Sequence, residues 1–167
     1  MGMYQNFLDI MNVIYNDEDL LRLLYYPPAN LGTDTLDPLD PCLPNIKDME
    51  VKTKWNIINE RVMLTPKTDD LDSKAICRIL IYAGRRRPNS GNYLMAHQHF
   101  VVDIVCHFSF ENGDIRSTRI SDRLNELLAL QHITGIGKMD YYDGNQLSSP
   151  KEYVGYRHIY EFGSTKS

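Results

Sequence analysis

The sequence has few cysteines and no long hydrophobic run, and these two absences exclude several classes of protein. Its three cysteines (Cys42, Cys77 and Cys106) show no CxxC spacing, so a disulfide-stapled fold is excluded and reduced thiols in a cytosolic environment are expected. No apolar run approaches the roughly 20 residues that a membrane-spanning helix needs. Residues 1–12 also lack the basic and apolar regions of a signal peptide, so we expect no membrane partner.

The chain also lacks the positive charge that nucleic-acid binding requires. Its net charge is −4, and residues 1–74 carry 7 Lys+Arg against 13 Asp+Glu, whereas residues 75–167 carry 11 against 9. A DNA-binding protein needs a cationic face that displaces counterions from the phosphates. Specific nucleic-acid binding is therefore not expected.

Length and composition are those of one soluble domain. The chain has 167 residues, a mass of 19.4 kDa and 43% hydrophobic residues, and a chain of this size buries roughly 70% of its unfolded surface on folding. We expect residues 1–163 to form a single α+β domain and residues 164–167 to form a flexible tail.

The first 25 residues carry the pattern of two helices. Apolar residues recur at spacings of three and four between Tyr4 and Tyr15. Asn16 and the acidic residues 17–19 then indicate a break with a new N-cap, and leucines continue into a short second helix. The prolines at 27–28 end this helix, because proline lacks the amide hydrogen.

Residues 27–48 hold five of the eight prolines and fit neither a strand nor a helix. An irregular stretch of about 20 residues inside a compact domain is usually a functional loop or arm. Its apolar residues indicate that it packs against something, which the sequence leaves open as its own domain or a neighbouring subunit. These apolar residues are Leu31, Leu36, Leu39, Leu43 and Ile46.

The remainder of the chain is predicted to be mainly strands. Residues 50–58 fit either a short helix or an edge strand, residues 119–130 carry an apolar helical stripe, and the segments 84–92 and 143–150 read as loops. Strand patterns cover residues 61–65, 75–83, 97–110, 136–142 and 154–162. This order predicts an α+β fold with a mainly antiparallel sheet of about five strands. One main covering helix, an N-terminal helical segment and the Pro-rich arm complete it.

The strand at 97–110 has an almost wholly apolar face at its even positions and a mixed face at its odd positions. His97, His99 and Asp103 lie on the mixed face, and imidazole and carboxylate groups bind zinc or iron. His107 lies roughly 26 Å beyond His99 along an extended strand, so it cannot join the same site. Histidines on a half-exposed sheet face are the favoured interpretation, and we expect no metal, cofactor or catalytic residue.

Two further groups have the chemistry of a protein interface. Arg85, Arg86 and Arg87 could bind an acidic protein face or a phosphate, or simply lie in a solvated loop. Tyr141 and Tyr142 combine a large apolar body with a polar tip, which suits interfaces, although sheet packing is the alternative. The three arginines and two tyrosines, together with His97, His99 and Asp103, form the eight-residue interface that the sequence predicts.

Four segments of the second half, in order, resemble those of tail terminator (tail completion, head–tail joining) proteins of long-tailed bacteriophages. They are FVVDIVCHFSF at 100–110, RISDRLNELLAL at 119–130, GIGKMDYYDG at 135–144 and EYVGYRHIYEF at 152–162. The resemblance covers roughly residues 75–163, and the long N-terminal region with its Pro-rich segment departs from that family.

The resemblance implies a structural virion protein of the phage neck, assembled in the host cytoplasm. Such a protein forms a ring, usually a hexamer, that caps the tail tube and faces the head connector or adaptor protein. DNA would pass through the ring without specific binding. A ring needs two different patches that meet between copies, and the acidic arm and the basic segment are candidates.

Three alternatives remain at this stage. The first is another neck component, such as a head-closure or adaptor protein. The second is a small metal-dependent enzyme that uses His97, His99 and Asp103. The third is a monomeric cytosolic regulator.

Overall fold

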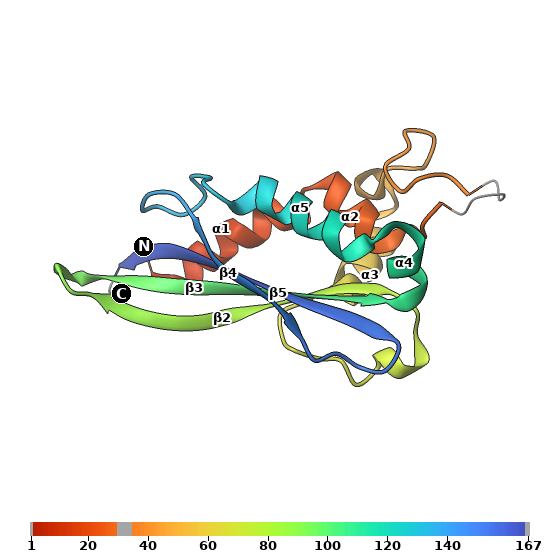
Figure 1. Cartoon of the computed structure of the whole chain (residues 1–167). Coiled ribbons are helices and arrows are strands. Elements are labelled where there is room, and N and C mark those ends of the chain that lie inside the picture. Colours follow the sequence, from red (N-terminus) through yellow and green to blue (C-terminus); the bar gives the residue numbers. More distant parts are fainter. Residues whose placement is uncertain (1, 30–34, 166–167) are drawn as a thin grey trace.

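A five-stranded sheet with helices on one face forms the architecture of the computed structural model, which describes residues 2–29 and 35–165 (Figure 1). The fold is α+β, as the sequence predicts. The helices are α1 (Met3–Tyr15), α2 (Glu18–Tyr25), α3 (Val51–Arg61), α4 (Phe108–Asp114) and α5 (Arg116–Leu128), with short 3-10 turns η1 (Ile46–Asp48) and η2 (Leu71–Ser73). The strands are β1 (Val62–Met63), β2 (Cys77–Asn89), β3 (Asn92–His107), β4 (Asp140–Leu147) and β5 (Tyr153–Thr165). None of the helices in these described ranges has the length and apolar character needed to cross a membrane.

The two N-terminal helices are separated at the predicted break. Asp17 is the N-cap of α2, and its carboxylate accepts a hydrogen bond from the backbone N–H of Leu20 (2.8 Å). This bond satisfies one of the amides that have no partner inside the helix. Ile10 and Ile14 of α1 are fully buried. The apolar spacing predicts the burial of Ile14, whereas Tyr4, at the start of the same pattern, is 78% exposed.

The described part of the Pro-rich segment packs against its own chain, which answers the question that the sequence left open. The guanidinium of buried Arg22 donates to backbone carbonyls of this segment, and the carboxylate of Glu18 accepts from the backbone N–H groups of Ile46 (2.6 Å) and Lys47 (3.0 Å). The carbonyls that accept from the guanidinium of Arg22 belong to Pro38 (N–O distance 3.2 Å), Asp40 (2.8 Å) and Leu43 (2.8 Å). Leu31 lies outside the described residues. A helix that precedes the segment therefore holds it in place.

The sheet has the strand order β1-β2-β3-β5-β4. Among the described strands, β1 runs parallel to its neighbour and the other pairs are antiparallel. Residues 50–58, for which the sequence allowed two interpretations, lie in α3. The main core lies between the helices and the face of the sheet that carries Phe100, Val102 and Ile104.

A smaller core lies on the opposite face, at the end of the sheet near α4. It contains Leu71, Ile76, Leu80, Val105 and Tyr153, so the segment between β1 and β2 covers this end. Figure 1 shows that segment on the side of the sheet away from the helices.

The strand predicted at 97–110 ends earlier than expected. β3 stops at His107, and residues 108–114 form α4, with Phe110 buried and Phe108 exposed. The imidazole Nδ1 of His107 accepts a hydrogen bond from the backbone N–H of Ser109 (3.2 Å), which stabilises the first turn of the helix. The apolar face at even positions is correct only as far as Cys106.

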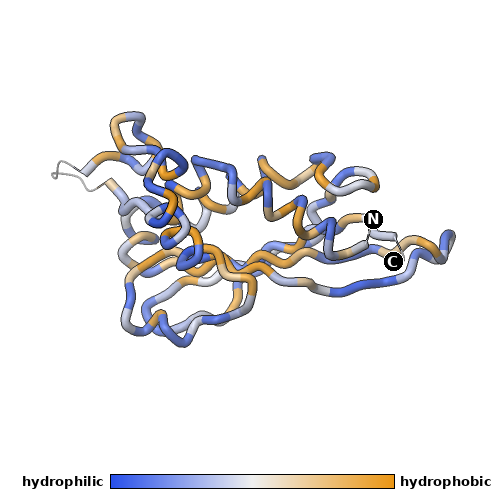
Figure 2. The backbone as a smooth tube through the Cα atoms, turned by 180° about the vertical axis from the view of Figure 1, so that it is seen from behind, coloured by the Kyte–Doolittle hydropathy of each residue, from blue (hydrophilic) through white to orange (hydrophobic). Residues whose placement is uncertain are grey.

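The segment 84–92 is mostly strand, where the sequence indicated a loop. β2 continues to Asn89 because its basic residues pair with β3, with Arg86 opposite Gln98 and Arg87 opposite His97. The two strands form a long hairpin whose projecting part is hydrophilic along β2 (Figure 2).

Other strand boundaries also differ from the prediction: β1 covers only Val62–Met63 of the expected 61–65, and β4 begins at Asp140 and not at residue 136. β4 extends to Leu147, into the segment that was expected to be a loop. β5 extends to Thr165, and Ser164 pairs with Ala96, so residues 164–165 of the expected tail are strand. Residues 166–167 lie outside the described range.

Candidate functional site

The eight residues of the predicted interface lie on three different strands. Arg85, Arg86 and Arg87 are on β2, which is an outer strand past its two-residue pairing with β1. His97, His99 and Asp103 are on the central strand β3, and Tyr141 and Tyr142 are on the outer strand β4. The structure therefore places the arginines and the tyrosines at opposite edges of one sheet.

The first edge, residues 81–89 of β2, is called here the basic edge. β1 pairs only with Ile79 and Leu80, and within the described ranges no other strand pairs with the outer side of β2. Arg85, Arg86 and Arg87 are all exposed.

Arg86 differs from its two neighbours, because its guanidinium reaches across β3 to the end of β5. It donates to the side chains of Gln98 and Ser164 (both 3.3 Å) and to the backbone carbonyl of Thr165 (3.2 Å). Arg86 therefore supports the hairpin, and Arg85 and Arg87 are better placed to meet a partner.

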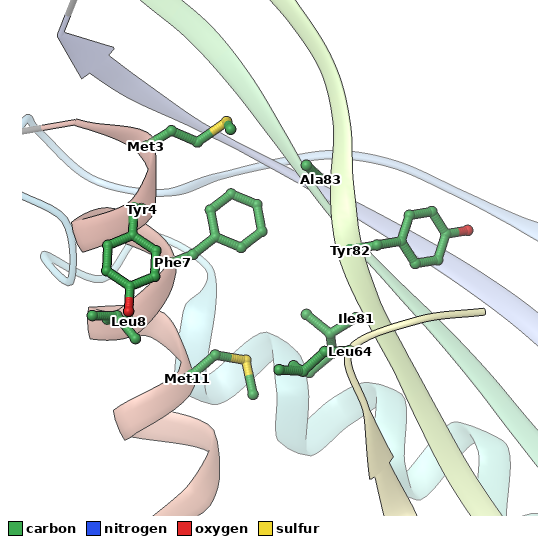
Figure 3. A pocket seen from close by; sticks show the side chains of 9 residues that line it. All are labelled: Met3, Tyr4, Phe7, Leu8, Met11, Leu64, Ile81, Tyr82 and Ala83. Atoms are coloured by element: carbon green, nitrogen blue, oxygen red, sulfur yellow. The ribbon is translucent and has the colours of Figure 1, made fainter. Parts of the chain in front are cut away.

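An apolar groove runs beside the basic edge, between α1 and β2 (Figure 3). Its volume is about 370 Å³. On one side it is lined by Met3, Tyr4, Phe7, Leu8 and Met11 of α1, and on the other by Leu64, Ile81, Tyr82 and Ala83. Figure 3 shows Met3, Phe7 and Met11 of α1 extending toward β2, whereas Tyr4 and Leu8 lie over the helix and the ring of Tyr82 points away from the groove. Tyr4 is 78% exposed, so apolar surface lies open to solvent beside the arginines.

The second edge, β4, is called here the acidic edge. It carries Asp140 and Asp143, both exposed, and no lysine or arginine. Tyr141 and Tyr142 remain 43% and 50% exposed although each ring contacts a histidine. The hydroxyl of Tyr141 lies 2.8 Å from Nδ1 of His158, which is thereby linked to this edge.

Tyr142 lies at a bulge in β4, and its ring centroid is 4.3 Å from that of His99. His99 is buried, and its Nε2 lies 3.0 Å from a carboxylate oxygen of Glu161; Nδ1 of the more exposed His97 lies 3.4 Å from the other oxygen. The two histidines thus share a carboxylate of β5 and not the predicted Asp103.

Asp103 has separate partners on the same face of the sheet. It is only 3% exposed and accepts hydrogen bonds from Arg157 Nε (2.7 Å) and the hydroxyl of Tyr82 (2.5 Å). Burial, together with the bond to Asp103, raises the pKa of Tyr82 to about 12, and the same carboxylate raises the pKa of Arg157. Across the described ranges, no three His, Cys, Asp or Glu side chains are grouped so that they could hold a metal ion.

The sequence interpretation missed a second polar site, around His158. This buried imidazole lies between the hydroxyls of Tyr141 and Ser121 (Nε2 to Oγ, 2.7 Å), and burial lowers its pKa. Arg157, His158 and Glu161 all lie on β5, where alternation shows which residues share a face. The alternation does not show their partners, because these come from β2, β3, β4 and α5.

Comparisons with known proteins identify relatives along almost the whole chain. The sequence profile of the YomW family matches residues 17–162. A protein of Bacillus subtilis (strain 168), described as "SPbeta prophage-derived uncharacterized protein YomW", is 31% identical over 166 residues, which are 94% of this chain and 94% of that protein. The profile match includes the whole of β2 and β4, and thus both edges, whereas α1 lies outside it.

Proposed function

Since the chain belongs to the YomW family, which has a prophage-derived member, we propose that it is a structural protein of the bacteriophage virion neck. The bacteriophage origin expected from the sequence is confirmed by this membership. The role that we propose is narrower: the protein forms a ring, a hexamer in the resembled family, that caps the tail tube and joins the tail to the head.

The two edges of the sheet are the observation that supports this role most strongly. In a closed ring of identical copies, each copy presents one patch to the preceding copy and a different patch to the next. The basic edge and the acidic edge lie on opposite sides of one sheet and have opposite charge. A single fold thus offers two different, complementary surfaces.

The tail tube protein and the head connector or adaptor protein are the other partners of this proposal. The ring would bind one on each of its flat faces, and DNA would pass through its centre without specific contacts. The net charge of −4 is consistent with such passage, because an acidic protein does not retain DNA phosphates.

Deletion of the gene from a lysogen that carries the prophage tests this function. After induction, we expect free heads and free tails in place of joined particles, because the connection is missing. The tails should also vary in length, because nothing caps the tube. Expression of the wild-type gene from a plasmid should restore joined particles, and a normal yield of joined virions without the gene would refute the proposal.

The position of the protein distinguishes a tail terminator from another neck component. An epitope-tagged copy should be found by electron microscopy at one end of tails made in a strain that produces no heads. Label on heads from a strain that produces no tails would instead favour a head-closure or adaptor protein. Metal analysis of the purified protein tests the alternative of a small metal-dependent enzyme, since stoichiometric zinc or iron would favour that function.

A further inference from the structure

Each of the two outer strands leaves one side of its backbone available for pairing. The basic edge is open past Leu80, and β4 is the last strand of the sheet. An exposed strand edge presents N–H and C=O groups that can pair with another chain. The open stretch of the basic edge, residues 81–89, is about as long as the eight-residue β4. The two edges are therefore matched in length.

The topology fixes the direction in which the two edges would pair. β2, β3, β5 and β4 are successively antiparallel, so β4 runs antiparallel to β2. If a second copy continues the sheet and keeps its helices on the same side, its β4 lies antiparallel to β2 of the first copy. This is the strand arrangement with the straighter hydrogen bonds.

Charge favours this pairing over the pairing of two identical edges. Two basic edges side by side would bring Arg85 and Arg87 against the same residues of another copy, and like charges on paired strands are destabilising. Pairing with the acidic edge instead brings Asp140 and Asp143 close to Arg85 and Arg87. The attraction between these opposite charges favours the pairing and selects the register of β4 against β2.

The apolar groove gives the pairing a second contact. Tyr141 lies on the helix-bearing face, because its hydroxyl contacts His158, whose other nitrogen contacts Ser121 of α5. Ile81 of β2 is buried in the core on the same face and lines the groove. On the neighbouring copy, the half-exposed ring of Tyr141 would therefore meet the groove beside α1, where its apolar body is covered.

From these observations we infer that β4 of one copy adds to the open edge of β2 on the next, with Tyr141 over the groove and Asp140 and Asp143 near Arg85 and Arg87. The inference rests on the ring of the proposed function and names its contact surfaces. Two features keep the added ladder short: Pro88 has no N–H, and a bulge follows Ala83. These features limit the length of strand that can pair along this edge.

A charge-exchange experiment with the purified full-length protein tests this pairing. One variant carries Arg85→Glu and Arg87→Glu, and the other carries Asp140→Lys and Asp143→Lys. Each alone has two edges of the same sign, so we expect the concentration for half-assembly to rise at least about tenfold. In an equimolar mixture every contact can again join opposite charges, so rings of alternating variants should form near the wild-type concentration.

Sedimentation velocity measures the assembly, and native mass spectrometry should find the two variants in equal numbers within each mixed oligomer. A control with Lys47→Glu and Lys52→Glu makes the same change of charge as the arginine variant but on η1 and α3, and it should assemble as the wild type does. A third variant, Leu8→Lys in the groove, should weaken assembly without rescue by either charge variant.

The outcomes separate this inference from the proposed function. Edge variants that assemble like the wild type, or a mixture that fails to recover, overturn the edge pairing even if the deletion lysogen loses its joined particles. A wild-type protein that stays monomeric at all concentrations overturns it too. Recovery in the mixture, with normal virions from the deletion lysogen, would instead support the pairing and refute the neck function.

Discussion

Replacement of Arg116 is the most demanding test of how the helical layer is held together. This residue begins α5 and is fully buried. One nitrogen of its guanidinium donates to the backbone carbonyls of Leu23 (2.5 Å) and Tyr26 (2.7 Å), at the end of α2. The others donate to the carboxylate of Asp114 (2.9 and 3.1 Å). Because the last carbonyls of a helix have no partner inside it, Arg116 connects α2 to α5.

In Arg116→Met, the side chain keeps much of its volume and loses every one of these hydrogen bonds. Two carbonyls and a mostly buried carboxylate then lose a partner, although Arg119 still contacts Asp114 (3.0 Å). Breaking a buried pair in this way costs about 3–5 kcal/mol, a large part of the 5–15 kcal/mol that is typical of a whole domain. Arg116→Lys keeps the charge but not the planar fork, so its loss should be smaller.

Urea unfolding, followed by circular dichroism and by the fluorescence of Trp55, measures this loss. With a slope of about 1–3 kcal/mol per molar urea, the midpoint should fall by more than about 1 M for Arg116→Met. Arg85→Met on the exposed hairpin is the matched control, and it should change stability by no more than about 0.5 kcal/mol. If the free energy of unfolding of Arg116→Met lies within about 1 kcal/mol of that of the control, Arg116 does not connect the two helices as we infer.

Three further perturbations are expected to have measurable effects. Burial lowers the pKa of His158 below its usual 6.5, so the unfolded chain binds a proton more readily and stability is lost as the pH falls below about 6.5. In His158→Gln, the urea midpoint should therefore change less between pH 7 and pH 5 than in the wild type. An equal change of the midpoint in both proteins would contradict this. In Gly84→Ala, the new Cβ would lie 2.7 Å from Cγ2 of Val101, so stability should fall by about 1–3 kcal/mol, whereas Gly91→Ala in the turn should be tolerated. Glu18→Ala removes the acceptor of two backbone N–H groups of the Pro-rich segment, so limited proteolysis should cut that segment faster than in the wild type. Equal cleavage rates would show that Glu18 does not hold the segment in place.

The parts of the fold that local sequence determines could be predicted. The break between α1 and α2 depends on Asp17 and a few residues around it, and the apolar spacing of α5 depends on one helix face. The end of β3 could not be found in this way, because Phe108 and Phe110 continue the strand alternation. It depends on the contact between His107 and Ser109, which the pattern of apolar residues does not show.

The hairpin shows why composition alone was misleading. The segment GRRRPNSGN has the residues of a turn, and in isolation nothing would favour a strand. β3 supplies the partner, and Arg86 reaches across it to the end of β5, so the same residues extend the ladder. Pairing with β3, supported by the contact from Arg86 to the end of β5, therefore overrides the local preference.

The sequence could not assign the residues of the predicted interface to surfaces, because strand order decides which strands are edges. β5 follows β4 in sequence but lies between β3 and β4 in the sheet. If β4 paired directly with β3, the outer strand would be β5, and Arg157 and Glu161 would give that edge no net charge. The observed order instead places Asp140 and Asp143 at the margin and leaves Glu161 inside, next to His97 and His99. The charge difference between the two edges, on which the proposed ring depends, is thus a property of the topology as much as of the residues.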